Sequence, residues 1–497
     1  MRGWSAATTD ARARNGVEPP PFAGGHASSL ERGTAAAGIY TGAVRLGLEI
    51  AVARAAGQLS RLSGRGGGTT LPGKILAAID PGALGALAGR LPLGSALVSA
   101  TNGKTTTAAI VAEIIGDRIR LAHNRAGANL VSGVASALLA QRDAELGLFE
   151  VDEGAFPDIA GRVRPQAVCL ANLFRDQLDR YGELELVAER WRSAVAELPP
   201  DAWVAANVDD PLVAAIVRGR ERALGFGLDD PRVARERLPH AADSKYCVVC
   251  GTANAYAAAY VGHLGDWRCP GCGLARPPLD VAARAVELDG LAGAAFDLAT
   301  PQGTRRVELA LPGLYNVYNA VAAASLALVL GASLEEIAAG IGRFRAAFGR
   351  FERIQAGDRS VLLLLVKNPA GANEVVRTLV SGGPPRLVVI ALNDDIADGR
   401  DVSWIWDVDY EPLLDGLEHV VVTGSRAQEL ALRFKYGGLG PDAIEVVPAL
   451  EQALDRGLAL TPQGGELVVL PTYTAMLALR GIAARRGLVR QYWEAAA

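Results

Sequence analysis

The segment from Ser99 to Thr107 constrains this chain more than any other. An apolar stretch, 96–98, precedes it and a helix-like stretch, 108–115, follows. A strand, a tight turn and a helix N-terminus in this order form an anion site. A lysine after glycine can reach the terminal phosphates of a nucleotide, and the next hydroxyl can ligate Mg²⁺. The predicted nucleotide-binding residues are Thr101, Asn102, Gly103, Lys104, Thr105 and Thr106.

The segment is not a complete Walker A motif. The pattern G-x-x-x-x-G-K-[ST] requires glycine at the position that Val98 occupies. We therefore expect a family of nucleotide-binding proteins whose loop lacks this first glycine.

Length and charge exclude several classes of protein. At 497 residues the chain is expected to hold two to four domains. Lys plus Arg total 50 against 54 Asp plus Glu, a net charge of -4 that gives no electrostatic reason to expect nucleic acid. No stretch reaches the roughly 18 uncharged apolar residues of a membrane span, so we expect a soluble, cytoplasmic protein.

The first 60 or so residues differ in composition from the rest. Residues 1–36 contain three consecutive prolines and no long apolar run, and are predicted to be a disordered tail. Segment 38–59 is predicted to be a helix. Charged residues interrupt its apolar face, which favours a packed helix over an amphipathic helix at a membrane surface.

Four of the five cysteines form two C-x-x-C pairs. The pairs, Cys247 with Cys250 and Cys269 with Cys272, are 18 residues apart, the spacing of a Cys₄ zinc ribbon. Two disulfides are the alternative, but a chain without secretion signals is expected in a reducing compartment. Four thiolates leave no open coordination position, so the Zn²⁺ predicted in residues 243–276 is structural.

Short apolar runs alternate with helix-like stretches along most of the chain, which predicts a parallel α/β architecture. Cys169 lies in one such run and is interpreted as a core residue rather than a nucleophile. The alternation pauses near residue 350 and then restarts. We therefore expect a central ATP-binding domain over 37–349 and a smaller α/β domain over 350–497.

Four blocks in this order resemble the Mur ligases, ATP-dependent enzymes of peptidoglycan synthesis that join an amine to a carboxylate through an acyl phosphate. The blocks are 101–106, 207–211, 311–320 and 349–352. That family also uses a nucleotide loop without the first Walker glycine, which accounts for Val98. The resemblance implies a Mur-type central ATPase domain with an inserted ribbon, followed by a Rossmann-like C-terminal domain.

From about residue 38 onward the chain resembles more specifically the branch of the family that amidates lipid II. The ribbon and the segments 172–183 and 398–407 carry this resemblance. Gln177 and Lys367 stand where other Mur ligases carry histidine. A recognisable N-terminal domain for the uridine nucleotide is also lacking, so the usual soluble precursor is not the expected substrate.

The resemblance implies conversion of D-glutamate in the lipid II stem peptide to D-isoglutamine, with ATP consumed and glutamine supplying the nitrogen. Lys104 would neutralise the β- and γ-phosphates, and Thr105 and Glu153 would hold Mg²⁺. Asn316 and Arg350 match nucleotide contacts of the family, with Asn319 as a weaker candidate.

Each of these roles has a structural alternative. Glu153 and the neighbouring Asp152 can be acids of a solvent-exposed loop. Asn316 can be a helix cap, and Arg350 can be a surface charge.

Nitrogen delivery requires a second protein. A glutaminase needs an activated cysteine beside a histidine, and the five histidines here include none in a recognisable partner motif. The resemblance assigns this step to GatD, a class I glutamine amidotransferase that forms a heterodimer through the C-terminal domain. Two tryptophans and several acids within 401–407 suit such an interface.

We hypothesise that Asp401 orients the catalytic histidine of the partner, with Asp398 or Asp407 as the next candidates. The alternative is an aspartate that caps a helix beside core tryptophans.

Two other functions compete with the amidating ligase. One is a Mur-type ligase of the folylpolyglutamate or cyanophycin kind, against which the ribbon and segment 398–407 argue. The other is a non-catalytic nucleotide-binding scaffold, which an intact Lys104, Thr105 and Glu153 disfavour. A lipid-linked substrate requires only peripheral contact with the inner face of the cytoplasmic membrane.

Overall fold

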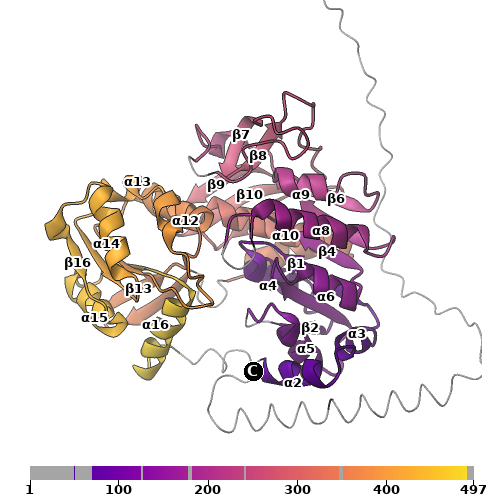
Figure 1. Ribbon diagram of the computed structural model, residues 1–497, viewed down its shortest axis with the longest axis horizontal. Coiled ribbons are helices and arrows are strands. Elements are labelled where there is room, and N and C mark those ends of the chain that lie inside the picture. The colour runs from indigo at the N-terminus through magenta and orange to yellow at the C-terminus, as the bar shows by residue number, and fades with distance from the viewer. Residues whose placement is uncertain are drawn as a thin grey trace, which may run out of the picture.

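The computed structural model describes residues 50, 70–124, 127–176, 182–239, 242–345 and 351–489. The expected tail, all but one residue of segment 38–59, and the expected boundary at 349/350 lie outside this part of the chain. The strands form a nine-stranded sheet, a six-stranded sheet and a separate two-stranded hairpin. Figure 1 shows the two large sheets in two lobes that lie side by side.

The nine-stranded sheet builds the larger lobe. Its strands are β1 (Ser95–Ser99), β2 (Leu121–His123), β3 (Leu146–Val151), β4 (Ala167–Leu170), β5 (Trp203–Asn207), β6 (Ala223–Leu228), β9 (Val281–Asp289), β10 (Gly293–Thr300) and β11 (Gly303–Leu309). They lie in the order β11-β10-β9-β6-β5-β4-β1-β3-β2, and pairing is parallel from β2 to β9. The central strands β1, β3 and β4 are fully buried, as expected of apolar parallel strands that are covered on both faces.

Helices cover both faces of this sheet. One face carries α4 (Lys104–Ile115), α10 (Leu314–Val329) and α11 (Leu334–Arg343). The other carries α3 (Ala83–Ala88), α5 (Val131–Ala140), α6 (Phe156–Val163), α8 (Leu184–Ala196) and α9 (Pro211–Ile216), with α2 (Leu71–Ile79) packed on α5. Helix α10 is apolar on every side and almost wholly buried, because it lies between the sheet and α4.

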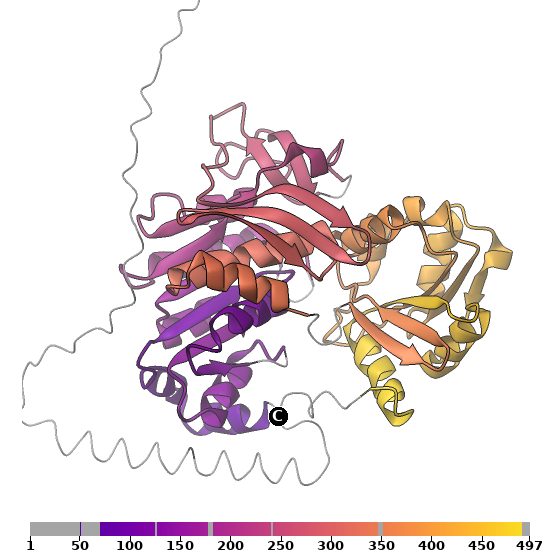
Figure 2. The same ribbon diagram turned by 180° about the vertical axis from the view of Figure 1, so that it is seen from behind.

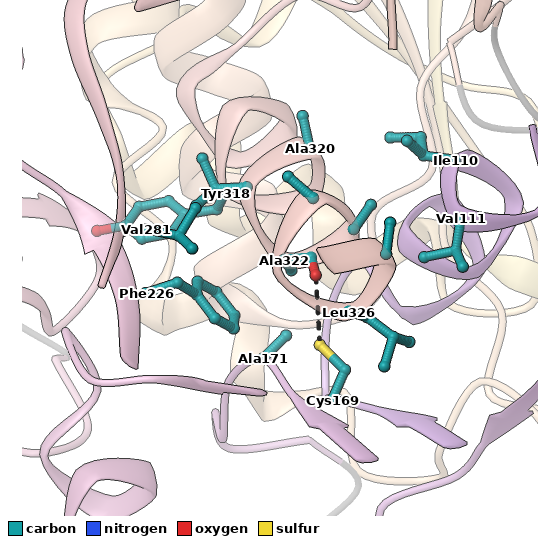
Figure 3. Close-up of a cluster of buried hydrophobic side chains, with 14 of the residues drawn as sticks. Ile110, Val111, Cys169, Ala171, Phe226, Val281, Tyr318, Ala320, Ala322 and Leu326 are labelled. Carbon is teal, nitrogen blue, oxygen red and sulfur yellow. Dashed lines mark hydrogen bonds between the residues drawn. The ribbon is translucent and has the colours of Figure 1, made fainter. Parts of the chain in front are cut away.

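Cys169 lies in the core between β4 and α10. Its side chain is fully buried, and the thiol donates to the carbonyl of Ala322 at 3.8 Å (Figure 3). Burial raises the pKa of this thiol to about 12. The expectation of a core residue is confirmed.

The smaller lobe has the same layered construction. Its strands are β12 (Glu352–Ala356), β13 (Arg359–Leu363), β14 (Leu387–Ala391), β15 (His419–Thr423), β16 (Ile444–Val446) and β17 (Glu466–Pro471), in the order β12-β13-β17-β14-β15-β16. Only the β12–β13 pair is antiparallel. One face carries α12 (Pro369–Ser381), α13 (Glu411–Leu414) and α14 (Ala427–Tyr436), and the other carries α15 (Leu450–Leu460) and α16 (Tyr473–Arg485).

Two elements join the lobes. Helix α12 is the part of the smaller lobe that lies nearest the larger one, in both views of the molecule (Figures 1 and 2). The hairpin of β7 (Ala255–Val261) and β8 (Leu264–Arg268) is inserted between β6 and β9.

Three short 3₁₀ helices, η1 (Pro231–Val233), η2 (Ser403–Asp407) and η3 (Pro441–Ala443), complete the described elements. The expected α/β architecture, with a second and smaller α/β unit, is confirmed.

Candidate active site

Gly103 places the predicted phosphate loop directly against α10. It is the N-cap of α4 and has a φ of +88°, a conformation that favours glycine. A Cβ atom at this position would lie 1.9 Å from Oδ1 of Asn319. Two features of the loop therefore favour glycine at position 103: the positive φ of the turn and the close approach of the backbone to α10.

The amine of Lys104 folds back into the loop. It donates to the carbonyl of Ala100 at 2.9 Å and to Oε2 of Glu153 at 2.8 Å, and both side chains of this ion pair are buried. Burial alone would lower the pKa of Lys104, but the carboxylates of Glu153, Asp152 and Glu150 outweigh it and raise the pKa. Lys104 is therefore held as a cation. Asp152 and Glu153 are buried, not acids of an exposed loop.

The oxygen atoms beside Lys104 fit a magnesium ion. Oγ1 of Thr105 is buried and has no hydrogen-bond partner in the described part of the chain. Glu153 adds a carboxylate from the turn that follows β3. Hydroxyl and carboxylate oxygens are ligands of the kind that Mg²⁺ takes, usually together with phosphate oxygens of a nucleotide.

Thr101 and Asn102 fasten the loop to the segment after β4. The backbone N–H of Asn102 donates to Oδ1 of Asn172, and Nδ2 of Asn172 donates to the carbonyl of Asn102, both at 2.9 Å. The hydroxyl of Thr101 accepts from the backbone N–H of Phe174 at 3.1 Å and donates to its carbonyl at 3.3 Å. The loop and residues 172–174 thus form one hydrogen-bonded unit.

Asn316 lies at the start of α10, facing the loop. It is buried, donates from Nδ2 to the carbonyl of Pro312 at 2.8 Å, and accepts from Nδ2 of Asn319 at 3.0 Å. The helix N-cap is Gly313, so Asn316 is not a cap. Thr106 is buried in the first turn of α4 and also lines the site. The remaining predicted contact, Arg350, lies outside the described residues.

The loop opens into a cavity of about 350 Å³ that both lobes line. The larger lobe contributes residues 101–106, Glu153 and Asn316. The smaller lobe closes the cavity with residues that the motifs did not assign, namely Lys367, Gly371, Glu374, Ala397 and Tyr473. The cavity therefore exists only where the two lobes meet.

Asn368 joins the start of α12 to the phosphate loop. Its Nδ2 donates to Oδ1 of Asn102 at 3.0 Å, and Nδ2 of Asn102 donates back to Oδ1 of Asn368 at 3.1 Å. The neighbouring Lys367 forms an ion pair with Asp176 of the larger lobe. The one sequence signal for this contact is the Asn-Pro step that starts α12, which predicts a cap but not its partner.

Further along α12, charged side chains bind the base of the ribbon hairpin. Glu374 is buried and pairs with Arg235. Arg377 donates to the carbonyl of Tyr260 at 2.9 Å and to that of Val233 at 2.8 Å. The inserted hairpin therefore takes part in the contact between the lobes.

The four ribbon cysteines converge as predicted. Their sulfur atoms lie within 4.8 Å of one another, with 3.6 Å between Cys247 and Cys272 and 3.4 Å between Cys250 and Cys269. The backbone N–H groups of Val249 and Cys272 point at the thiols of Cys247 and Cys269, each at 3.4 Å, an arrangement that favours thiolates. Hydrogen bonds with Thr252 lower the pKa of Cys250 to about 6, whereas burial and the other three ribbon thiols raise the pKa of Cys272 to about 12. Four converging sulfur ligands fit a tetrahedral Zn²⁺ ion.

The three aspartates proposed to face a partner differ in their surroundings. Asp401 is exposed and accepts a hydrogen bond from the backbone N–H of Ser403, the first residue of η2, at 2.8 Å. Asp398 is buried, and both its carboxylate oxygens are taken by the backbone and hydroxyl of Thr474. Asp407 is half-buried and lies 3.5 Å from Arg175 of the larger lobe. Asp401 is the most accessible of the three.

Comparison with known proteins identifies the family. The "Mur ligase middle domain" matches residues 98–262, and the "MurT ligase C-terminal" domain matches residues 365–476. The MurT subunit of lipid II isoglutaminyl synthase from Streptococcus pneumoniae is 33% identical over 442 residues, which cover 87% of this chain and 95% of that protein. The chain belongs to the MurT family. The chain is also 30% identical to the MurT subunit of Staphylococcus aureus N315 over 432 residues, which cover 86% of this chain and 95% of that protein.

The fold of this MurT-family chain also occurs in more distant ligases. A pseudomurein peptide ligase type C from Methanothermus fervidus superposes with a TM-score of 0.64 over 79% of this chain and 78% of that chain, at 20% identity. Family and fold together make this chain an ATP-dependent ligase of the Mur type. Among the described residues, no helix has the length and apolar character needed to span a membrane.

Proposed function

We propose that this MurT-family chain amidates the α-carboxyl of D-glutamate in the lipid II stem peptide, using ATP and ammonia from a GatD-type glutaminase. The observation that carries the proposal is a cavity at which three features meet: the Lys104–Glu153 pair, the Thr105 hydroxyl, which has no partner among the described residues, and the C-terminal lobe. The names of the bacterial relatives supply the reaction, synthesis of isoglutamine in lipid II.

The site is suited to activating a carboxylate. A carboxylate is a poor electrophile, and transfer of the γ-phosphoryl group of ATP to it gives an acyl phosphate that ammonia can attack. Phosphoryl transfer depends mainly on positioning and charge neutralisation. Lys104 would exchange its ion pair with Glu153 for contacts with the β- and γ-phosphates of ATP. Asn316 and Thr106 line the same cavity and would contact the nucleotide, as we propose for Arg350.

Thr105 and Glu153 are the residues that would hold Mg²⁺. The ion would neutralise phosphate charge during transfer. The ribbon thiolates would hold Zn²⁺ in a purely structural role, because four protein ligands complete its coordination.

The C-terminal lobe is the proposed contact for the glutaminase. Asp401 is exposed, and Trp406 nearby is 45% exposed; tryptophan is enriched among the residues that anchor protein interfaces. We propose that Asp401 orients the catalytic histidine of GatD. With the chain divided at 349/350, as we propose, the C-terminal lobe would contact the glutaminase and the larger lobe would bind ATP. The lipid-linked substrate would place the complex at the inner face of the cytoplasmic membrane.

The central experiment measures ADP release and amide formation with purified chain, ATP, lipid II and ammonium chloride. We expect ADP release to require both lipid II and ammonium at steady state, with mass spectrometry showing an amide at the α-carboxyl of D-glutamate. Lys104→Ala should reduce turnover by about 100-fold or more. Lys74→Ala, an exposed lysine on α2, is the matched control. ADP release that ignores lipid II, or ligation of an amino acid instead of ammonia, would contradict the proposal.

A second experiment tests the partner. Asp401→Asn should abolish glutamine-dependent amidation in the reconstituted pair and spare ammonium-dependent amidation. Asp415→Asn, another exposed acid of this lobe, should affect neither. Equal loss of both activities in Asp401→Asn would exclude the proposed role.

A further inference from the structure

The cavity contains a carboxylate oxygen that nothing in the described chain satisfies. Asp176 follows β4, lines the cavity, and has a side chain that is only 4% exposed. Its Oδ2 pairs with Lys367, but its buried Oδ1 has no hydrogen-bond partner among the described residues. A buried acceptor left unpaired keeps the full cost of its removal from water. A ligand with a hydrogen-bond donor is therefore expected at this atom.

The position of Asp176 is fixed by its neighbours. Phe174, two residues before it, is held on both backbone groups by Thr101 of the phosphate loop. The backbone N–H of Arg175 donates to Asp243 at 3.1 Å. On the opposite side, Lys367 precedes Asn368, which is bonded to the same loop. Asp176 is thus held at a set distance from the place where the phosphates bind.

The chemistry of the reactants selects the ligand. The proposed reaction brings a nucleotide, a carboxylate and ammonia into one cavity. The phosphates and the carboxylate are anions, which a second carboxylate repels. The nucleotide base also carries N–H groups, but Asp176 lies beside Thr101 and Glu153, at the phosphate end of the site. Ammonia is the remaining reactant, and it carries hydrogen-bond donors without negative charge.

The other acids of the cavity are less suited to this role. Glu374 pairs with Arg235 and lies 3.9 Å from Arg377, so two guanidinium groups already surround its carboxylate. Glu150 accepts from Asn129 at 3.4 Å and adds to the negative field that holds Lys104 charged. Oε2 of Glu374 and Oε2 of Glu150 also lack a hydrogen-bond partner among the described residues, but Glu374 already faces two guanidinium groups and Glu150 lies in β3 of the larger lobe. Asp176 combines such an oxygen atom with a position between the two lobes and an ion pair with one lysine.

Resting on the proposed function, we infer that Asp176 is the ammonia-binding residue of the site and the proton acceptor for amide formation. Its Oδ1 accepts an N–H hydrogen bond from ammonia, which orients the nitrogen lone pair toward the acyl phosphate. The nitrogen attacks the carbonyl carbon, the bond from that carbon to the phosphate oxygen breaks, and inorganic phosphate leaves with the electron pair. The proton that the nitrogen loses passes to Asp176 and then to solvent.

A single-turnover experiment separates this step from the phosphoryl transfer that precedes it. Full-length chain is mixed with ATP and lipid II, without ammonium, and the burst of ADP is measured. Ammonium chloride is then added and amide formation is followed. We expect Asp176→Asn to give the ADP burst of the wild type but to form amide at least about 100-fold more slowly, the scale of a lost proton acceptor.

Two further variants make the outcome decisive. Asp176→Glu keeps a carboxylate in the cavity and should recover amide formation to well above the rate of Asp176→Asn. Asp229→Asn removes an acid that pairs with Arg284 at the surface and should match the wild type. Loss of the ADP burst in Asp176→Asn would assign the residue to phosphoryl transfer and overturn the inference, as would unchanged amide formation. A wild type without a lipid II-dependent burst would instead overturn the proposed function, and the inference with it.

Discussion

Gly103→Ala tests the contact between the phosphate loop and α10. The φ of +88° at this residue costs an alanine about 1–2 kcal/mol, because its Cβ approaches the following carbonyl. The new methyl group would also lie 1.9 Å from Oδ1 of Asn319, whose carboxamide is held by Asn316. Displacing a buried, bonded side chain adds about 1–3 kcal/mol. We expect a total destabilisation of about 2–5 kcal/mol.

The two contributions can be separated with a double-mutant cycle. Asn319→Ala removes the obstructing carboxamide but leaves the backbone of residue 103 unchanged. In Gly103→Ala/Asn319→Ala the overlap disappears and only the cost of the positive φ remains. The double variant should therefore be about 1–3 kcal/mol more stable than the sum of the single effects predicts.

The assay is urea unfolding of the full chain, together with the dissociation constant of ATP for each variant. Both readouts are expected to show the same sign of coupling, because the strained loop also supplies the phosphate-binding N–H groups. Additive effects of the two substitutions would refute the close approach of Gly103 to Asn319. An unchanged stability of Gly103→Ala would refute the strain argument as well.

Three further predictions follow from the contacts around the cavity. Asn368→Ala loses the α12 cap and two bonds to Asn102, and should weaken ATP-dependent turnover and cost about 2–4 kcal/mol, whereas Asn368→Asp keeps the cap and should cost less than half of that in the same unfolding assay. Removing Zn²⁺ with a chelator should lower the melting temperature and turnover together, and Cys250→Ser should do the same without chelator; full activity after verified metal loss would exclude a structural ion. Burial raises the pKa of Asp209 to about 6, so its contribution to stability is complete below its unfolded pKa of 3.8 and is lost as the pH rises through 6. Between about pH 4 and pH 7 the unfolding free energy of the wild type should therefore fall by up to about 3 kcal/mol more than that of Asp209→Asn, and equal slopes would contradict this.

The larger part of the fold follows from local sequence patterns. Strands such as β3 and β15 are apolar runs bounded by turn residues, and they form where those runs predict them. The phosphate loop and the ribbon were predictable because each is a short segment with fixed spacing. Their chemistry depends on residues that are close in sequence.

Contacts between distant segments had no such signal. Asn102 and Asn368 are 266 residues apart, and Lys367 and Asp176 are 191 apart. Each residue is an ordinary polar side chain, and only the packing of the two lobes brings the partners together. The same holds for Glu374. Its sequence position predicts a solvent-facing helix residue, but the base of the ribbon hairpin covers its side chain. The half of the cavity that the C-terminal lobe supplies could therefore not be predicted from single motifs.

The interface between the lobes combines neutral and charged contacts within two adjacent residues. Asn368 binds through amides that carry no net charge, whereas Lys367 binds through an ion pair and is partly exposed. Dissolved ions screen exposed charges over about 10 Å at 0.1 M ionic strength and over about 3 Å at 1 M, but leave neutral amide pairs almost untouched. Asp176 is only 4% exposed and Lys367 is 24% exposed, so salt screens this ion pair mainly from the side of Lys367. Raising the ionic strength should therefore weaken the Lys367–Asp176 pair modestly and leave the amide pair of Asn368 and Asn102 unchanged. A salt titration can therefore weaken one contact that lines the cavity while another contact between the lobes persists.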